Sequence, residues 1–171
     1  MSLTPFATKV AKFLNKKSHF HRIDFSFYDC RVNPQAFASV GAAILKGRIK
    51  VASVASDAGC YDFATNTLTI ISKGDPITVG SMIVHEAVHA HHDLIGKPML
   101  ALKDEGAAYT AQAMFELCNG RDIPGNPAFE LARYFWGKSK SNLKELTTQL
   151  AQALNNTGSG GERLYDLKQT N

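Results

Sequence analysis

Two histidines and a glutamate lie within five residues of one another, in the run His85-Glu86-Ala87-Val88-His89. On a helix of about 3.6 residues per turn, His85 and His89 occupy one face, so that both imidazoles can bind the same metal ion. Glu86 directly follows the first histidine, and its carboxylate can take a proton from a water bound to that metal. These residue types at this spacing predict a zinc-dependent peptidase in which Glu86 is the general base.

The same pattern also occurs by chance in proteins that bind no metal, so its surroundings must decide between a metal site and ordinary surface histidines. Apolar side chains flank the pattern and place it on a buried helix; they are Ile83, Val84, Ala87 and Val88. A buried glutamate is costly without a cation or a hydrogen-bond donor beside it. A zinc ion would supply that cation, and we therefore favour the metal site.

Catalytic zinc usually has three protein ligands and a water molecule, so a third ligand is expected beyond the two histidines. The first helix should end at Gly96-Lys97-Pro98, after which apolar positions recur at helical spacing from Ala108. Glu105 would open this second helix, and we predict that it is the third ligand. Asp104 is the alternative, because helix boundaries read from a sequence shift by a few residues. If Glu105 is the ligand, replacing Asp104 should leave the zinc affinity nearly intact.

The stretch from His85 to Asp93, followed after a short linker by Asp104-Glu105-Gly106-Ala107, resembles the gluzincin metallopeptidases of the thermolysin type. The resemblance covers about residues 78 to 118. It implies a zincin fold and a peptide or protein substrate. By this resemblance, the zinc ligands would be His85, His89 and Glu105. Glu86 would be the general base, and Asp93 would support the metal-binding helix.

Tyr109 marks a departure from the family pattern. Gluzincins usually have an aspartate four residues after the ligand glutamate, where it orients a ligand histidine, and this chain has Tyr109 there. One turn past Glu105, Tyr109 can instead donate a hydrogen bond to the oxyanion of the tetrahedral intermediate, as a second donor beside zinc. The alternative is that Tyr109 supports or packs against the metal ligands.

Other histidines allow a test of the metzincin pattern, which needs Gly and His at seven and ten residues after the first ligand. This chain has His92 and Ile95 at those positions, so the metzincin pattern is excluded. His92 lies on the face of His89, but as a fourth ligand it would close the open coordination position, and we expect it either at the rim or behind a metal ligand that it supports. His19 and His21 are remote and are interpreted as polar members of a strand.

The composition fits one enzyme domain of ordinary globular character. The chain has 171 residues, of which 44% are hydrophobic and 20% charged, with a formal net charge of +4. We predict a single domain over residues 1–154 and a flexible linker and tail over residues 155–171, which begin in a run rich in Asn, Gly and Ser. Cys30, Cys60 and Cys118 lack the CxxC spacing of a structural zinc site and are expected to be unbridged and buried.

The basic residues are concentrated in the first 50 residues, which hold nine Lys or Arg and two Asp. Lys9, Lys12 and Lys16 recur at helical spacing opposite an apolar stripe, so a solvated helix face is favoured over a nucleic-acid or membrane surface. No apolar run reaches the roughly 18 to 20 residues of a membrane span, and the N-terminus lacks the apolar stretch of a signal peptide. We expect a cytoplasmic protein, with export by a signal-independent route as an alternative.

The coarse secondary structure predicts an α+β, zincin-like fold, with a small mixed sheet, the metal-binding helix and a helical C-terminal half. Leu45 and Leu143 are among the side chains expected to face the core. Leu68 to Ser72 is the candidate edge strand beside an extended substrate, and the alternative is an interior strand with a structural role alone. The predicted elements are a helix over 5–17, a strand over 20–28, a helix from 34 that stops at Gly47, a strand over 49–53, a hairpin of 61–63 and 68–71, the metal-binding helix, the helix opened by Glu105, a helix from 127 and a helix capped by Ser141.

Three classes of function remain open. The first is a zinc metallopeptidase, which in a chain of this size can be a cytosolic protease, a phage product or a bacterial effector. The second is a zinc amidase that cuts cell-wall peptide cross-links. The third is a catalytically inactive zincin-like binding module, against which the presence of Glu86 speaks, because binding alone needs no base.

Overall fold

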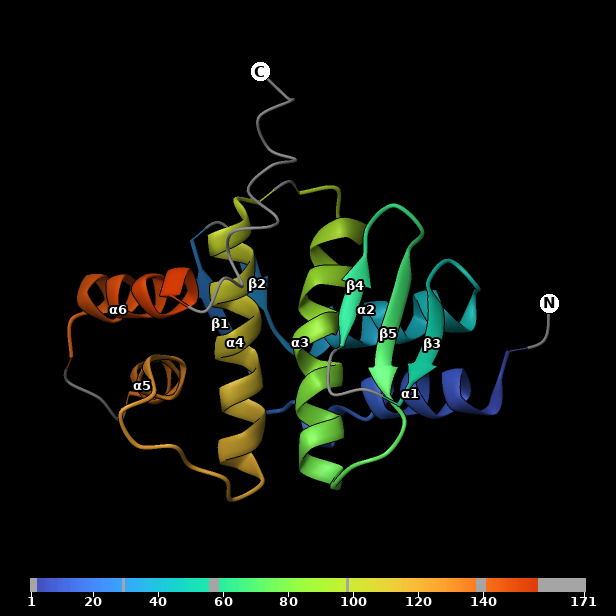
Figure 1. The fold of residues 1–171 in the computed structure, drawn as a ribbon, viewed down its shortest axis with the longest axis horizontal. Coiled ribbons are helices and arrows are strands. Elements are labelled where there is room, and N and C mark those ends of the chain that lie inside the picture. Colours follow the sequence, from blue (N-terminus) through green and yellow to red (C-terminus); the bar gives the residue numbers. More distant parts are fainter. Residues whose placement is uncertain (1–2, 29, 56–58, 98, 138–140, 157–171) are drawn as a thin grey trace.

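A computed structural model describes residues 3–28, 30–55, 59–97, 99–137 and 141–156 (Figure 1). Within these residues the chain forms an α+β fold of six α-helices, one short 3-10 helix and two small sheets. The helices are α1 (Pro5–Asn15), η1 (Lys17–His19), α2 (Pro34–Leu45), α3 (Pro76–Leu94), α4 (Ala101–Cys118), α5 (Pro127–Phe135) and α6 (Leu143–Asn156). The strands are β1 (Phe25–Phe27), β2 (Cys30–Val32), β3 (Lys50–Val54), β4 (Cys60–Asp62) and β5 (Thr67–Ile71).

Helices α3 and α4 stand side by side at the centre of the molecule (Figure 1). The three-stranded sheet lies beside α3, with α1 and α2 packed nearby, while α5 and α6 pack against α4. Small residues on α4 permit the close approach of its neighbours: a Cβ atom added at Gly106 would lie 2.9 Å from the Phe27 ring. Close packing therefore fixes the two central helices, and side chains that lie between them are held in place.

The three-stranded sheet is mixed, as predicted, but its strand order is β3-β5-β4. Strand β5 pairs in parallel with β3 and antiparallel with β4, with Leu68 opposite both Val51 and Tyr61. The prediction that residues 68–72 form the edge strand is therefore wrong, because both edges of β5 are occupied, and the alternative of an interior strand is confirmed. Strand β4 is the edge strand that lies next to α3 (Figure 1).

The strand expected over residues 20–28 is reduced to β1, which forms a two-stranded antiparallel hairpin with β2. Phe20 and Ile23 are fully buried, but they lie in a turn in which the Ile23 amide donates to the Phe20 carbonyl. The apolar residues at the start of the predicted strand are therefore buried as part of a turn and not of a strand. His19 lies in η1 and His21 in the turn, so neither belongs to a strand.

Helix starts were predicted correctly where the sequence has a side-chain cap. Thr4, Asn33 and Asn126 each accept a hydrogen bond from a backbone amide at the start of α1, α2 and α5, which all begin with proline. Helix α4 begins at Ala101, four residues before the predicted start, and its N-cap Leu100 makes no side-chain hydrogen bond. Without a cap, the sequence carries no signal for that boundary.

Some predicted side-chain environments are wrong. Leu45 and Leu143 are exposed because they lie at the last and first residues of α2 and α6, beyond the reach of the core. Ser141 was the predicted cap of α6, and Asn142, the next residue, accepts a hydrogen bond from the Lys144 amide at the start of this helix. Of the predicted linker, residues 155 and 156 belong to α6, while residues 157–171 lie outside the described part of the chain.

The structure also shows the state of the three cysteines and the exposure of the basic face of α1. Cys30, Cys60 and Cys118 all lie in the described residues and form no disulfide, but Cys60 is exposed where a buried side chain was predicted. Lys9 and Lys16 are exposed as expected for a solvated helix face. In the described part of the chain, no helix combines the length and the apolar character needed to cross a membrane.

Candidate metal centre

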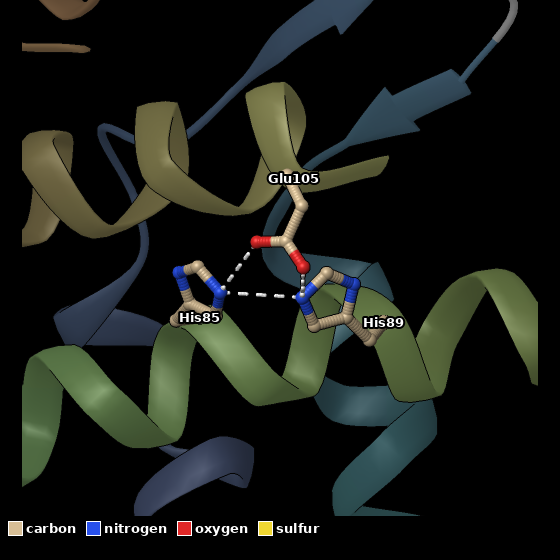
Figure 2. Close-up of side chains that lie close together, drawn as sticks. All are labelled: His85, His89 and Glu105. Carbon is tan, nitrogen blue, oxygen red and sulfur yellow. Dashed lines mark hydrogen bonds and ion pairs between the residues drawn. The ribbon is translucent and has the colours of Figure 1, made fainter. Parts of the chain in front are cut away.

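His85 and His89 face α4 from the middle of α3, one helical turn apart (Figure 2). Asp75 caps the helix by accepting from the Ile77 and Thr78 amides, which fixes where the helix begins and hence its face. Both histidines are buried, with His89 only 1% exposed, and their Nε2 atoms lie 3.2 Å apart. The two imidazoles therefore present one nitrogen each to the same point between the helices.

Glu105 reaches this point from the first turns of α4 (Figure 2). Its Oε2 lies 3.3 Å from His85 Nε2, and its Oε1 lies 3.5 Å from His89 Nε2. Two atoms bound tetrahedrally to one zinc ion at about 2.0–2.1 Å lie about 3.3–3.4 Å apart. The separations of His85 Nε2 from His89 Nε2 and from Glu105 Oε2 are close to this distance, and the three side chains form a cluster that could hold a metal ion.

The Nδ1 atom of His85, on the side of the ring away from Glu105, is hydrogen-bonded to Gln112, a residue that the sequence analysis did not predict. His85 Nδ1 lies 3.1 Å from Gln112 Oε1, and Gln112 Nε2 donates to Glu116 Oε1 at 3.1 Å. Glu116 Oε2 lies 3.8 Å from Arg121 Nη1. Because the Glu116 carboxylate can only accept, it holds the Gln112 carbonyl toward His85. His85 Nδ1 must then carry the proton, which leaves a lone pair on Nε2.

Asp104 has the corresponding role for His89. Its Oδ2 accepts from His89 Nδ1 at 2.7 Å, and its Oδ1 accepts from His92 Nδ1 at 2.5 Å. Burial raises the pKa of Asp104, but the hydrogen bonds with His89 and His92 outweigh it and hold the pKa far below its ordinary value. Asp104 is therefore a charged acceptor that orients a candidate ligand, and it lies outside the cluster of possible metal ligands.

The electrostatics of the cluster favour a cation. Burial lowers the pKa of His89, but the bond to Asp104 and the nearby charges of Glu105 and Glu86 outweigh it, so the pKa is raised. With both Nδ1 protons committed, two imidazole lone pairs and a carboxylate face one another across 3.2 to 3.5 Å. Lone pairs at this separation repel unless a proton or a metal ion lies between them. A divalent ion satisfies all three donors at once.

Glu86 and Tyr109 line a cleft beside this cluster, with a volume of about 300 Å³. Glu86 is 5% exposed, and its Oε2 makes no hydrogen bond to any residue that the structure describes. The ring of Tyr109 packs edge-on against the His85 ring, with centroids 4.5 Å apart. Tyr109 thus has the packing contact that was the alternative to a donor role, and it also borders the cleft.

His92 and Asp93, the other two predicted residues of α3, lie in the last turns of the helix, beyond His89. His92 is buried and donates to Asp104, which also accepts from His89, so of its two expected positions His92 occupies the one behind the candidate ligands and not the rim. Asp93 accepts a hydrogen bond from the Tyr61 hydroxyl at 2.7 Å, which ties the end of α3 to edge strand β4. This contact agrees with a supporting role for Asp93.

Gln112 provides a test of this arrangement. In Gln112→Leu the His85 Nδ1 proton loses its acceptor, and we expect metal affinity to fall by about 10–100-fold, as for other groups that orient metal ligands. The affinity is measured by competition with a chromophoric chelator. Gln149→Leu, an exposed glutamine on α6 bonded to Glu145, is the matched control and should bind as the wild type does. Unchanged affinity in Gln112→Leu would show that this hydrogen bond does not orient the ligand.

Sequence reasoning missed Gln112 and Glu116, although a weak signal was present. Both lie on the helical face of Glu105, seven and eleven residues after it. A polar face on a helix whose other faces are rich in alanine indicates the side that faces the candidate metal centre. In comparisons with known proteins, no protein-family model, curated protein or solved structure matches this chain.

Proposed function

We propose that this protein is a zinc-dependent peptidase with a zincin-like fold and a gluzincin-like ligand set. One observation carries the proposal: Glu86, a buried carboxylate whose Oε2 has no hydrogen-bond partner among the described residues, lines a cleft together with His85, one member of the His85, His89 and Glu105 cluster. A ligand cluster alone would suit a structural metal site. The neighbouring base and the cleft are what a hydrolytic site needs in addition.

Zinc is the metal that these donors suit best. The cluster offers two neutral imidazole nitrogens and one carboxylate, a donor set that tetrahedral zinc accepts and that the oxygen-preferring Mg²⁺ and Ca²⁺ do not favour. Three protein donors leave one position for water or substrate, which is the pattern of catalytic rather than structural zinc. Asp104 and Gln112 hold the two rings so that the Nε2 atoms of both point at the place that the metal ion would occupy.

The chain's own residues then supply the remaining chemistry. Bound zinc would act as a Lewis acid and lower the pKa of water in the cleft. Glu86 accepts the proton of the attacking water and returns it to the leaving amine. The low exposure of Glu86 keeps bulk water away from the carboxylate, which strengthens its interaction with the transferred proton. Tyr109, at the border of the cleft, is the proposed second donor to the oxyanion.

Metal removal tests this function. The purified protein should contain about one zinc ion per chain, and a peptidase assay on unfolded casein should lose its signal on chelation and recover it with one equivalent of zinc. His85→Ala should abolish both zinc retention and recovery. An assay on cell-wall peptide cross-links run beside casein separates peptidase from amidase. Full zinc retention in the His85→Ala, His89→Ala double variant, or hydrolysis that survives complete metal removal, would overturn the proposal.

A further inference from the structure

A second cavity lies on the opposite face of α3 from the metal centre, with a volume of about 590 Å³. Its walls come from α1, η1, the first two turns of α3 and the end of α4. Of α3 it touches Ile77, Val79, Gly80 and Ile83, whereas the cleft beside the metal centre touches the other side of the helix. The two hollows share no lining residue. A volume of this size is typical of small-molecule sites, which span roughly 300–1,000 Å³.

The body of the cavity is apolar. Aromatic rings of α1 and α4 and aliphatic side chains of α3 form its walls; they are Phe6, Phe13, Phe115, Val79 and Ile83. Phe13 and Phe115 pack edge-on, with ring centroids 5.7 Å apart, so this wall is fixed by the core of the protein. Such a surface favours an apolar ligand that it can remove from water.

The cavity lining also contains polar and basic side chains. Lys9, Ser18, His19 and His21 line it, and no acidic side chain is among the lining residues that the structure describes. Burial and the ammonium of Lys16 lower the pKa of His19, so its ring is neutral near pH 7. The His19 Nδ1 atom is buried and has no hydrogen-bond partner among the described residues. A neutral imidazole, a hydroxyl and one ammonium in the lining suit an acceptor that carries one negative charge.

We propose that this cavity binds an amphiphile with an apolar chain and a carboxylate head, that is, a fatty acid of medium length. The chain lies among the aromatic rings, and the carboxylate pairs with Lys9 and accepts hydrogen bonds from Ser18 and His19. An apolar ligand without a charge would leave the polar and basic lining groups without a ligand partner, and a cationic ligand would be repelled by Lys9. The site is independent of the proposed catalysis, because it uses none of the residues of the metal centre.

The head-group preference can be tested by calorimetric titration of the full chain with decanoate, decan-1-ol and decyltrimethylammonium. We expect decanoate to bind at one molecule per chain and at least about tenfold more tightly than either of the other two. Lys9→Glu should reverse the preference in favour of the cation. Lys12→Glu changes an exposed lysine of the same helix that does not line the cavity, and it should bind like the wild type. Equal binding of all three amphiphiles, or no binding of decanoate, would overturn the proposal.

A second measurement locates the ligand. Cys118 lines the cavity, and burial raises the pKa of its thiol, so labelling with iodoacetamide at mildly alkaline pH reports access to the cavity. The exposed Cys60 is first replaced by serine. Decanoate should slow the labelling of Cys118 at least tenfold, and Ile77→Trp, which fills the cavity from the α3 side, should abolish calorimetric binding. Decanoate that binds without protecting Cys118, or that still binds to Ile77→Trp, would place the ligand elsewhere.

Discussion

Replacing Glu86 by glutamine should lower peptide hydrolysis by roughly 10²–10⁴-fold while the protein keeps its fold and its metal. Glutamine has almost the shape of glutamate, so the packing around residue 86 is retained. Its amide cannot accept a proton at neutral pH, so the general base is lost. The side chain is also outside the cluster of possible metal ligands, which gives no reason for the metal affinity to fall.

The measurement combines kcat on a peptide substrate with zinc content and circular dichroism of the same sample. Glu130→Gln, which removes a carboxylate on α5 that pairs with Arg133, is the matched control and should retain activity. An active Glu86→Gln protein would remove the mechanism from the peptidase proposal. Loss of zinc from this variant would instead show that Glu86 serves the metal site.

The parts of this site that the sequence predicts are those set by local geometry. His85 and His89 share a face because helical periodicity alone places residues four apart together, and apolar neighbours show that this face is buried. Glu105 could be chosen because a second helix after Gly96 returns antiparallel and brings its first turns opposite the middle of α3. The structure does bring these three side chains together.

The parts that could not be predicted depend on contacts between distant segments. The sequence of β5 is that of any buried strand, and only pairing with both β3 and β4 makes it the central strand. Likewise Asp104 and Glu105 are adjacent carboxylates, and the crossing of α3 and α4 decides which one faces Nε2 and which one faces Nδ1. The orientation of Gln112 depends in turn on Glu116, so its role appears only when both side chains are in place.

The second large effect is expected at Glu105. In Glu105→Ala one direct bond to the metal is lost and only two imidazoles remain, so affinity should fall by more than about 100-fold, beyond the roughly 10–100-fold typical of residues that orient ligands. Glu105→Gln keeps an oxygen but loses its charge, and we expect it to lie between the wild type and Glu105→Ala. Both affinities are measured by chelator competition.

The loss of metal affinity in an Asp104 variant, compared with the loss in Glu105→Ala, decides which of the two carboxylates is the metal ligand. The structure replaces the expectation that Asp104 is dispensable, because its two oxygens accept from His89 and His92. In Asp104→Asn the amide nitrogen must face one of these two Nδ1 protons, so one ring turns or loses its acceptor, and metal affinity should fall by about 10–100-fold. Asp122→Asn, at an exposed aspartate outside the metal centre, should have no effect. A larger loss in Asp104→Asn than in Glu105→Ala would make Asp104 the ligand and remove the gluzincin-like arrangement from the proposal.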